Sequence, residues 1–179
     1  MNVSRCEASR VRRGQRGFTL IEVMIALGLL LVAAAGVMPL GLLAIKTTEN
    51  QGHLLARTTE YAQDKLEQLM SLSYGDSTSD TREFPAADLG GTGLTIGGSS
   101  DPDAPVALYV DYLDADGTLM PSEGTEAPEG WYYKRVWQIS SPRALLKQIT
   151  VTAIVRTAVA SGIGGTPRST VSVLKTSPF

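Results

Sequence analysis

The most constraining feature of the sequence is an apolar run from Phe18 to Ile45, 28 residues that contain one charged side chain, Glu22. The uncharged part, Val23 to Ile45, has 23 residues. About 20 helical residues suffice to cross the hydrocarbon core of a bilayer. The sequence therefore predicts a membrane-spanning helix over residues 18–45.

Charge is distributed unevenly around this run. Five of the 16 basic residues and one of the 18 acidic residues precede Phe18, which leaves 11 basic and 17 acidic residues after Gly17. Because basic flanks stay on the cytoplasmic side of a membrane, we expect residues 1–17 in the cytoplasm and the bulk of the chain outside it. The negative charge of that bulk disfavours nucleic acid as a partner.

Three ordinary explanations of the segment compete. A secretory signal peptide would end at a small-residue site such as Ala33-Ala34-Ala35, but the apolar run continues ten residues past it. Twin-arginine export would use Arg12-Arg13, yet Gly14-Gln15 follows where apolar residues are needed. A plain single-span anchor would let Glu22 reach the membrane surface.

Glu22 is costly wherever it lies in hydrocarbon, because a charged side chain there costs at least about 2.5 kcal/mol. No basic residue within the run can serve as its partner. A cut between Gly17 and Phe18 would create an α-ammonium group four residues away. In helices packed side by side with an axial offset, this group of one chain can pair with Glu22 of the next. Such a pair would favour assembly and fix its register.

The stretch Gly17-Phe18-Thr19-Leu20-Ile21-Glu22-Val23 resembles the class III signal of type IV prepilins and type II secretion pseudopilins. In that signal a glycine precedes the cut, and phenylalanine, three further residues and glutamate follow it. The basic leader of residues 1–17 and the long apolar segment behind the signal also resemble this family.

The resemblance implies a role for each matching residue. A prepilin peptidase would cut after Gly17 and methylate the new amine of Phe18, and Glu22 would pair with a neighbour's N-terminus. Pro39 falls where many pilins have a kinking proline, and it removes a backbone donor. We therefore expect the helix to kink or locally melt near Ala35-Gly36.

Residues 46–74 predict an amphipathic continuation of the helix, ended by Tyr74-Gly75-Asp76. His53, the single histidine, is expected on its solvated surface. The face predicted to pack on a sheet consists of Leu55, Thr59, Ala62, Leu66, Leu69 and Ser73. The charged residues predicted on the other faces are Arg57, Glu60, Asp64, Lys65 and Glu67.

Residues 75–105 are rich in glycine, serine and aspartate and predict a variable loop with one brief strand, Leu94 to Ile96. Residues 106–179 predict a β-sheet domain. Its expected strands are Val106 to Leu113, Trp131 to Ile139, Leu145 to Thr157 and Thr170 to Thr176. The expected fold is α+β, with a long N-terminal helix packed on a small antiparallel sheet that has one buried face.

The segment Tyr112 to Glu123 fits two interpretations. As a calcium loop it would place Asp114, Asp116 and Glu123 at ligand positions, but Tyr112 stands at the first ligand position. As a hairpin it needs only a turn at Asp116-Gly117. The hairpin is the simpler interpretation, so no cofactor is expected; calcium stays the alternative because some pseudopilins hold calcium in their sheet loops.

Neither catalysis nor disulfide chemistry is indicated. The one cysteine, Cys6, lies in the leader, and no nucleophile stands at a motif spacing from a base. The run Trp131-Tyr132-Tyr133-Lys134-Arg135 could form an aromatic and basic nucleic-acid surface, although packing in the sheet is the commoner role of such residues. We therefore do not expect an enzyme.

The resemblance implies a minor type IV pilin-like subunit, most similar to the PilV type, that belongs to a tip or priming complex aiding pilus assembly. Its partners would be prepilin peptidase and other major and minor pilins or pseudopilins. It would span the inner membrane with a periplasmic sheet domain and then move to the pilus on the cell surface. The alternatives are a GspI-like minor pseudopilin of type II secretion and a membrane-anchored periplasmic binding domain that never polymerises.

Overall fold

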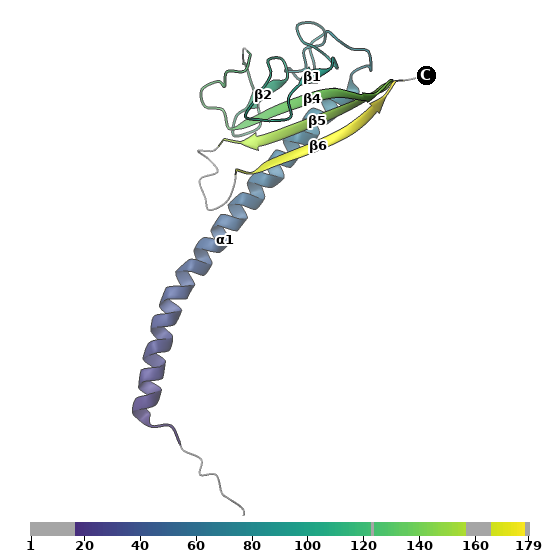
Figure 1. Cartoon of the computed structure of the whole chain (residues 1–179). Coiled ribbons are helices and arrows are strands. Elements are labelled where there is room, and N and C mark those ends of the chain that lie inside the picture. Colours follow the sequence, from purple (N-terminus) through teal and green to yellow (C-terminus); the bar gives the residue numbers. More distant parts are fainter. Residues whose placement is uncertain (1–16, 123, 157–165, 178–179) are drawn as a thin grey trace, which may run out of the picture. The chain divides into compact units, whose positions relative to one another are not determined.

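The computed structural model describes residues 17–122, 124–156 and 166–177. The chain divides into two compact units, Met1–Ala44 and Ile45–Phe179. One helix, α1 (Leu20–Ser71), contributes to both units, and every strand belongs to the second (Figure 1).

Helix α1 joins the two helical segments that the sequence predicted. Pro39 lies inside it, and the chain stays helical at Ala35-Gly36, so the local melting expected there is not observed. The kink at Pro39 stays a prediction. The helix ends at Ser71, three residues before the expected stop at Tyr74-Gly75-Asp76.

Within the described residues, six strands form one antiparallel sheet in the second unit. The main order is β3-β2-β4-β5-β6, and β1 pairs with β4 on the edge that β2 also uses. The α+β expectation is thereby confirmed. The strands are β1 (Gly97–Gly98), β2 (Val110–Leu113), β3 (Leu119–Met120), β4 (Tyr133–Arg143), β5 (Leu146–Val155) and β6 (Arg168–Thr176).

The early strands differ from the prediction. The strand expected at Leu94 to Ile96 is wrong, because Leu94 turns into the core and the pairing residues are Gly97–Gly98. A Cβ atom on Gly98 would lie 2.2 Å from the carbonyl oxygen of Trp137, so only glycine fits there. The strand expected from Val106 begins at Val110, since Leu108 has a positive φ of 69° that breaks extended structure. Strand β3 was not predicted.

The main core lies between the second half of α1 and one face of the sheet. Ile149, Val151, Ala153 and Val155 alternate inward along β5, as predicted. Strand β4 contributes Tyr133, Trp137 and Ile139 to the same core.

The helix face in this core is rotated from the predicted one. Leu55 is 47% exposed and Ser73 lies beyond the helix, whereas Ala62 and Leu69 are buried as expected. The buried residues of this face are Leu54, Thr58, Tyr61, Ala62, Lys65 and Leu69. Ala62 and Leu69 belong to both faces, so the rotation is smaller than the angle of about 100° that a shift of one residue produces. Because Leu54 and Leu55 are adjacent, either series can begin at a leucine.

The opposite face of the sheet is also partly covered, contrary to the expectation of a single buried face. Val110, Tyr112 and Val136 form a second buried cluster, against which Met120 and Trp131 pack. The hydroxyl of Tyr112 donates a hydrogen bond to the carbonyl oxygen of Thr125. The loop between β3 and β4 therefore covers this part of the outer face.

Candidate functional site

The N-terminal candidate site begins with three residues, Gly17 to Thr19, that precede the helix. The amide of Glu22 donates to the hydroxyl oxygen of Thr19 at 3.3 Å, and the amide of Val23 donates to the carbonyl oxygen of Thr19 at 3.2 Å. Thr19 is thus the N-cap of α1, and Glu22 is its third helical residue. This capping role was not predicted, although threonine followed three residues later by glutamate is its recognised signature.

Capping changes the electrostatic account of Glu22. The N-terminus of a helix carries a partial positive charge, which stabilises a carboxylate in the first turn by about 0.3–1 kcal/mol. That is smaller than the cost of at least about 2.5 kcal/mol for a carboxylate in hydrocarbon. The helix end therefore offsets part of the cost of placing the Glu22 carboxylate in hydrocarbon. A partner charge is needed to offset the rest.

Most of the apolar half of α1 is exposed in the first unit. Phe18 is 82% exposed and Leu20 is 79% exposed, and the most apolar 18-residue stretch of the helix has no buried residue. Within the described ranges, α1 is the one helix long and apolar enough to cross a membrane. A contiguous apolar surface of this kind marks contact with lipid or with other proteins.

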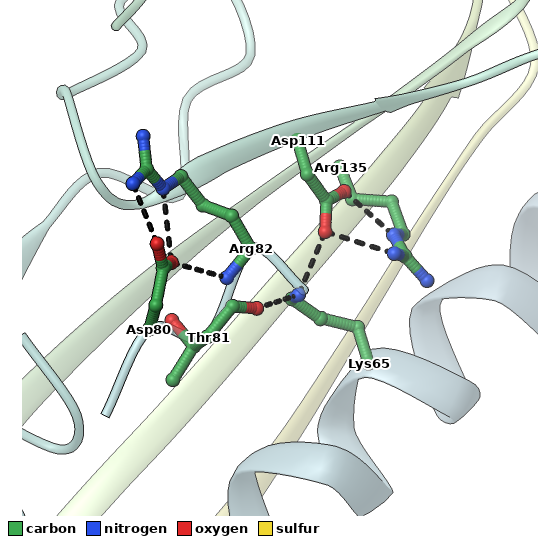
Figure 2. Close-up of polar contacts among 6 residues, drawn as sticks. All are labelled: Lys65, Asp80, Thr81, Arg82, Asp111 and Arg135. Atoms are coloured by element: carbon green, nitrogen blue, oxygen red, sulfur yellow. Dashed lines mark hydrogen bonds and ion pairs between the residues drawn. The ribbon is translucent and has the colours of Figure 1, made fainter. Parts of the chain in front are cut away.

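In the second unit, the ammonium group of Lys65 lies in a buried ionic cluster (Figure 2). Its Nζ atom is 2.7 Å from Oδ2 of Asp111 and donates to the carbonyl oxygen of Thr81. Arg135 donates to both oxygens of Asp111, at 2.7 and 2.8 Å. Lys65 had been predicted on a face of the helix away from the sheet. That prediction is wrong, because Asp111 and Thr81 supply acceptors for its ammonium group inside.

The cluster shifts the titration of its members. Burial lowers the pKa of Lys65 from 10.5 to about 8, although Asp111 opposes the shift. Burial alone would raise the pKa of Asp111, but the charges of Arg135 and Lys65 outweigh it and bring the pKa of this carboxyl below its ordinary value. The cluster therefore holds an ionised carboxylate between two cations at neutral pH.

Two lysines from the sheet bind backbone carbonyl groups, one at the end of α1 and the other in the loop that follows it. Lys175 of β6 donates to the carbonyl oxygens of Met70 and Leu72, each at 2.6 Å. Lys147 of β5 donates to the carbonyl oxygens of Tyr74 and Leu94, each at 2.7 Å. The last turn of the helix has no basic residue of its own. Lys175 thus supplies a donor for carbonyl groups that the helix end leaves unpaired, and Lys147 holds the loop after it.

The turn considered for calcium is a hairpin that joins β2 and β3. One carboxylate oxygen of Asp114 accepts hydrogen bonds from the amides of Asp116 and Thr118, and Gly117 has a positive φ of 87°. Glu123 lies outside the described residues. Among the residues that are described, no group of three or more histidine, cysteine, aspartate or glutamate side chains has metal-binding geometry.

The aromatic and basic run serves packing. Tyr133 is buried against Tyr61, with ring centroids 4.8 Å apart, and Trp131 packs on Tyr112. Arg135 forms an ion pair with Asp111.

His53 lies exposed on the helix, as predicted.

Residues 12–38 match a family model described as the prokaryotic N-terminal methylation motif. The match includes Gly17, Phe18 and Glu22 and ends one residue before Pro39. No curated protein and no solved structure matches the chain. The comparisons thus identify the N-terminal signal and leave the sheet unit to be interpreted from its own geometry.

Proposed function

We propose that the chain is the precursor of a minor type IV pilin-like subunit. A prepilin peptidase cuts between Gly17 and Phe18 and methylates the new N-terminus. One observation carries the proposal: the methylation motif over residues 12–38 includes the start of an exposed apolar helix whose first turn holds Glu22.

The exposed helix gives this subunit two environments. In the inner membrane lipid covers its apolar side chains, with residues 1–17 cytoplasmic and the sheet unit periplasmic. In a filament the same side chains pack against neighbouring helices. The α-ammonium group of Phe18 in one subunit then pairs with Glu22 of the next, and the pair sets their axial offset.

The second unit is built to act as a rigid head. The Lys65 and Asp111 ion pair and the Lys175 bonds to Met70 and Leu72 fasten α1 to the sheet at two levels. The absence of any cysteine besides Cys6 means that no disulfide closes the sheet, which favours a minor subunit of the PilV type in a tip or priming complex over a major pilin.

The experiment compares Glu22→Gln with Glu49→Gln in cells that make the filament. Glutamine at position 22 keeps a side chain suited to the capping position but removes the charge. Glu49→Gln removes a carboxylate from the same helix beyond the apolar run. We expect both variants to be inserted and cleaved, with a mature chain that begins at methylated Phe18 by intact mass spectrometry. Only Glu22→Gln should be depleted from sheared filaments, by at least about tenfold, because a hydrogen bond to a charged group contributes about 1.5–3 kcal/mol.

An intact Met1 would refute the processing step and support an anchored binding domain. A cut after Ala35 would also refute it, and would support a secretory signal peptide instead. Normal incorporation of Glu22→Gln would refute the charge pair. The signal is shared with type II secretion, so the same chain could serve as a GspI-like minor pseudopilin. Deletion of the chain decides between them, since loss of surface pili with intact protein secretion supports the pilus.

A further inference from the structure

Strand β6 forms one edge of the sheet. Among the described residues it pairs only with β5, through nine residues, Arg168–Thr176, and it is the outermost strand in Figure 1. The opposite edge is formed by the two-residue strands β1 and β3 and by the four-residue strand β2. The long, continuous edge of this sheet is therefore that of β6.

The hydrogen bonds at the two ends of β6 show which backbone groups face outward. The amide of Val155 donates to the carbonyl oxygen of Pro167 at 3.3 Å, and the amide of Ser177 donates to that of Leu145 at 3.0 Å. In an antiparallel ladder, alternate residue pairs are hydrogen-bonded. Because the register between these ends is uninterrupted, the backbone groups that bond to β5 are those of Ser169, Val171, Val173 and Lys175. The N–H and C=O groups directed to the open edge are those of Arg168, Thr170, Ser172, Leu174 and Thr176.

Proteins usually protect such an edge with charges, proline or a bulge. The stretch Ser169 to Leu174 has no charge and no proline, and β6 pairs with β5 without a register shift. Lys175 does not protect the edge, because its ammonium group binds Met70 and Leu72 at the end of α1. Among the described residues, the outward backbone groups from Thr170 to Leu174 have no protein partner.

We propose that this open edge accepts an extended strand from another subunit. The side chains of β6 define the chemistry of that strand. Val171 and Val173 are half-buried beside the core on the helix side. On the other side, Thr170 and Ser172 form hydroxyl pairs with Thr152 and Thr150 of β5. The incoming strand alternates β-branched apolar residues toward the helix with serine or threonine away from it.

A second copy of the chain does not suit the edge in antiparallel pairing. Thr58 bonds Ser169 at the start of β6, and Lys175 at its end bonds Met70, so the second half of α1 runs parallel to β6. Two copies joined through antiparallel β6 strands are related by a two-fold axis perpendicular to the sheet. Their helices would therefore run in opposite directions. If the chain joins a filament as proposed above, neighbouring copies are related by the helical symmetry of the filament and not by such a two-fold axis, so the occupant is a different subunit.

The test uses the full chain in detergent micelles and, as a probe, a nine-residue peptide of alternating valine and threonine. Backbone exchange is followed residue by residue. We expect the peptide to slow exchange of the amides of Thr170, Ser172 and Leu174 and to leave those of Val171 and Val173 unchanged.

Two lysine variants form a matched pair. Thr150 and Ser172 share one hydroxyl pair at 2.9 Å, so Thr150→Lys and Ser172→Lys lose the same side-chain bond and gain the same charge. Only Ser172→Lys places that charge on the edge strand, and it should weaken peptide binding about tenfold while Thr150→Lys does not. Equal thermal melting of the two variants shows that both are folded.

Absence of slowed exchange at the three amides, or equal weakening by both variants, would overturn the proposal. A dimer of the full chain that Ser172→Lys abolishes would overturn the assignment to a different subunit. The peptide assay requires no cleavage after Gly17, so its failure leaves the Glu22 test unaffected, and failure of that test leaves the peptide result standing.

Discussion

The ammonium group of Lys65 lies 2.7 Å from a carboxylate oxygen of Asp111, and both side chains are buried between α1 and β2. A helix can slide along an apolar sheet face at modest cost, but a buried ion pair has one productive position. This contact, completed by Arg135, therefore fixes the register of the helix on the sheet.

Asp111→Asn should destabilise the second unit by about 3–5 kcal/mol, because it leaves two buried cations without a counter-charge. Lys65→Met should cost less, since Asp111 and Arg135 remain paired. Urea denaturation of the full chain in detergent, followed by tryptophan fluorescence, measures both losses. A larger loss for Lys65→Met than for Asp111→Asn would show that the lysine, not the carboxylate, is the centre of the cluster.

The free energy of unfolding should rise as the pH increases from about 8 to 10.5. Lys65 has a lowered pKa of about 8 in the folded chain and an ordinary value of 10.5 when unfolded, so the unfolded chain binds more protons across this window. Tyr133 acts in the opposite sense above pH 10, because burial raises its pKa from 10.0 to about 12. Stability should therefore decline again toward pH 12.

Denaturation midpoints between pH 7 and 11 check this profile. In Lys65→Met the rise above pH 8 should shrink, whereas the decline due to Tyr133 should persist. A wild-type stability that stays constant or falls between pH 8 and 10 would contradict the buried, weakly basic state of Lys65.

Thr19→Val should fray the first turn of α1. Loss of an N-cap costs about 1 kcal/mol, which corresponds to an amide of Glu22 that exchanges roughly five times faster. Thr19→Ser, which keeps the hydroxyl group, is the control and should exchange at the wild-type rate. Hydrogen exchange of the full chain in micelles gives the result, and equal protection in all three proteins would rule out Thr19 as the cap.

Lys175→Met should loosen the last turn of α1, because the carbonyl groups of Met70 and Leu72 lose a charged donor at a cost of about 1–3 kcal/mol. Lys147→Met removes comparable bonds to Tyr74 and Leu94 and should loosen the following loop instead. Hydrogen exchange distinguishes the two locations. Faster exchange at the same amides in both variants would argue against separate roles.

Local features of this protein were predictable from sequence. The signal around Gly17, Phe18 and Glu22, the apolar length of the helix, the alternation along β5 and the turn at Asp116-Gly117 each depend on residues close together in the chain. Such features can be predicted because they depend only on residue type and spacing. A run of 23 uncharged residues, for example, is long enough to cross a bilayer in any fold.

The burial of Lys65, the rotated helix face, the second cluster around Tyr112 and the open edge of β6 were decided by tertiary structure. A lysine on a helix is exposed by default, and its burial becomes affordable only where Asp111 and Arg135 arrive from strands distant in the chain. An edge likewise belongs to a sheet and not to a strand. The order of the strands determines which backbone N–H and C=O groups stay unpaired. That order depends on how several segments pair, so it cannot be predicted from one segment.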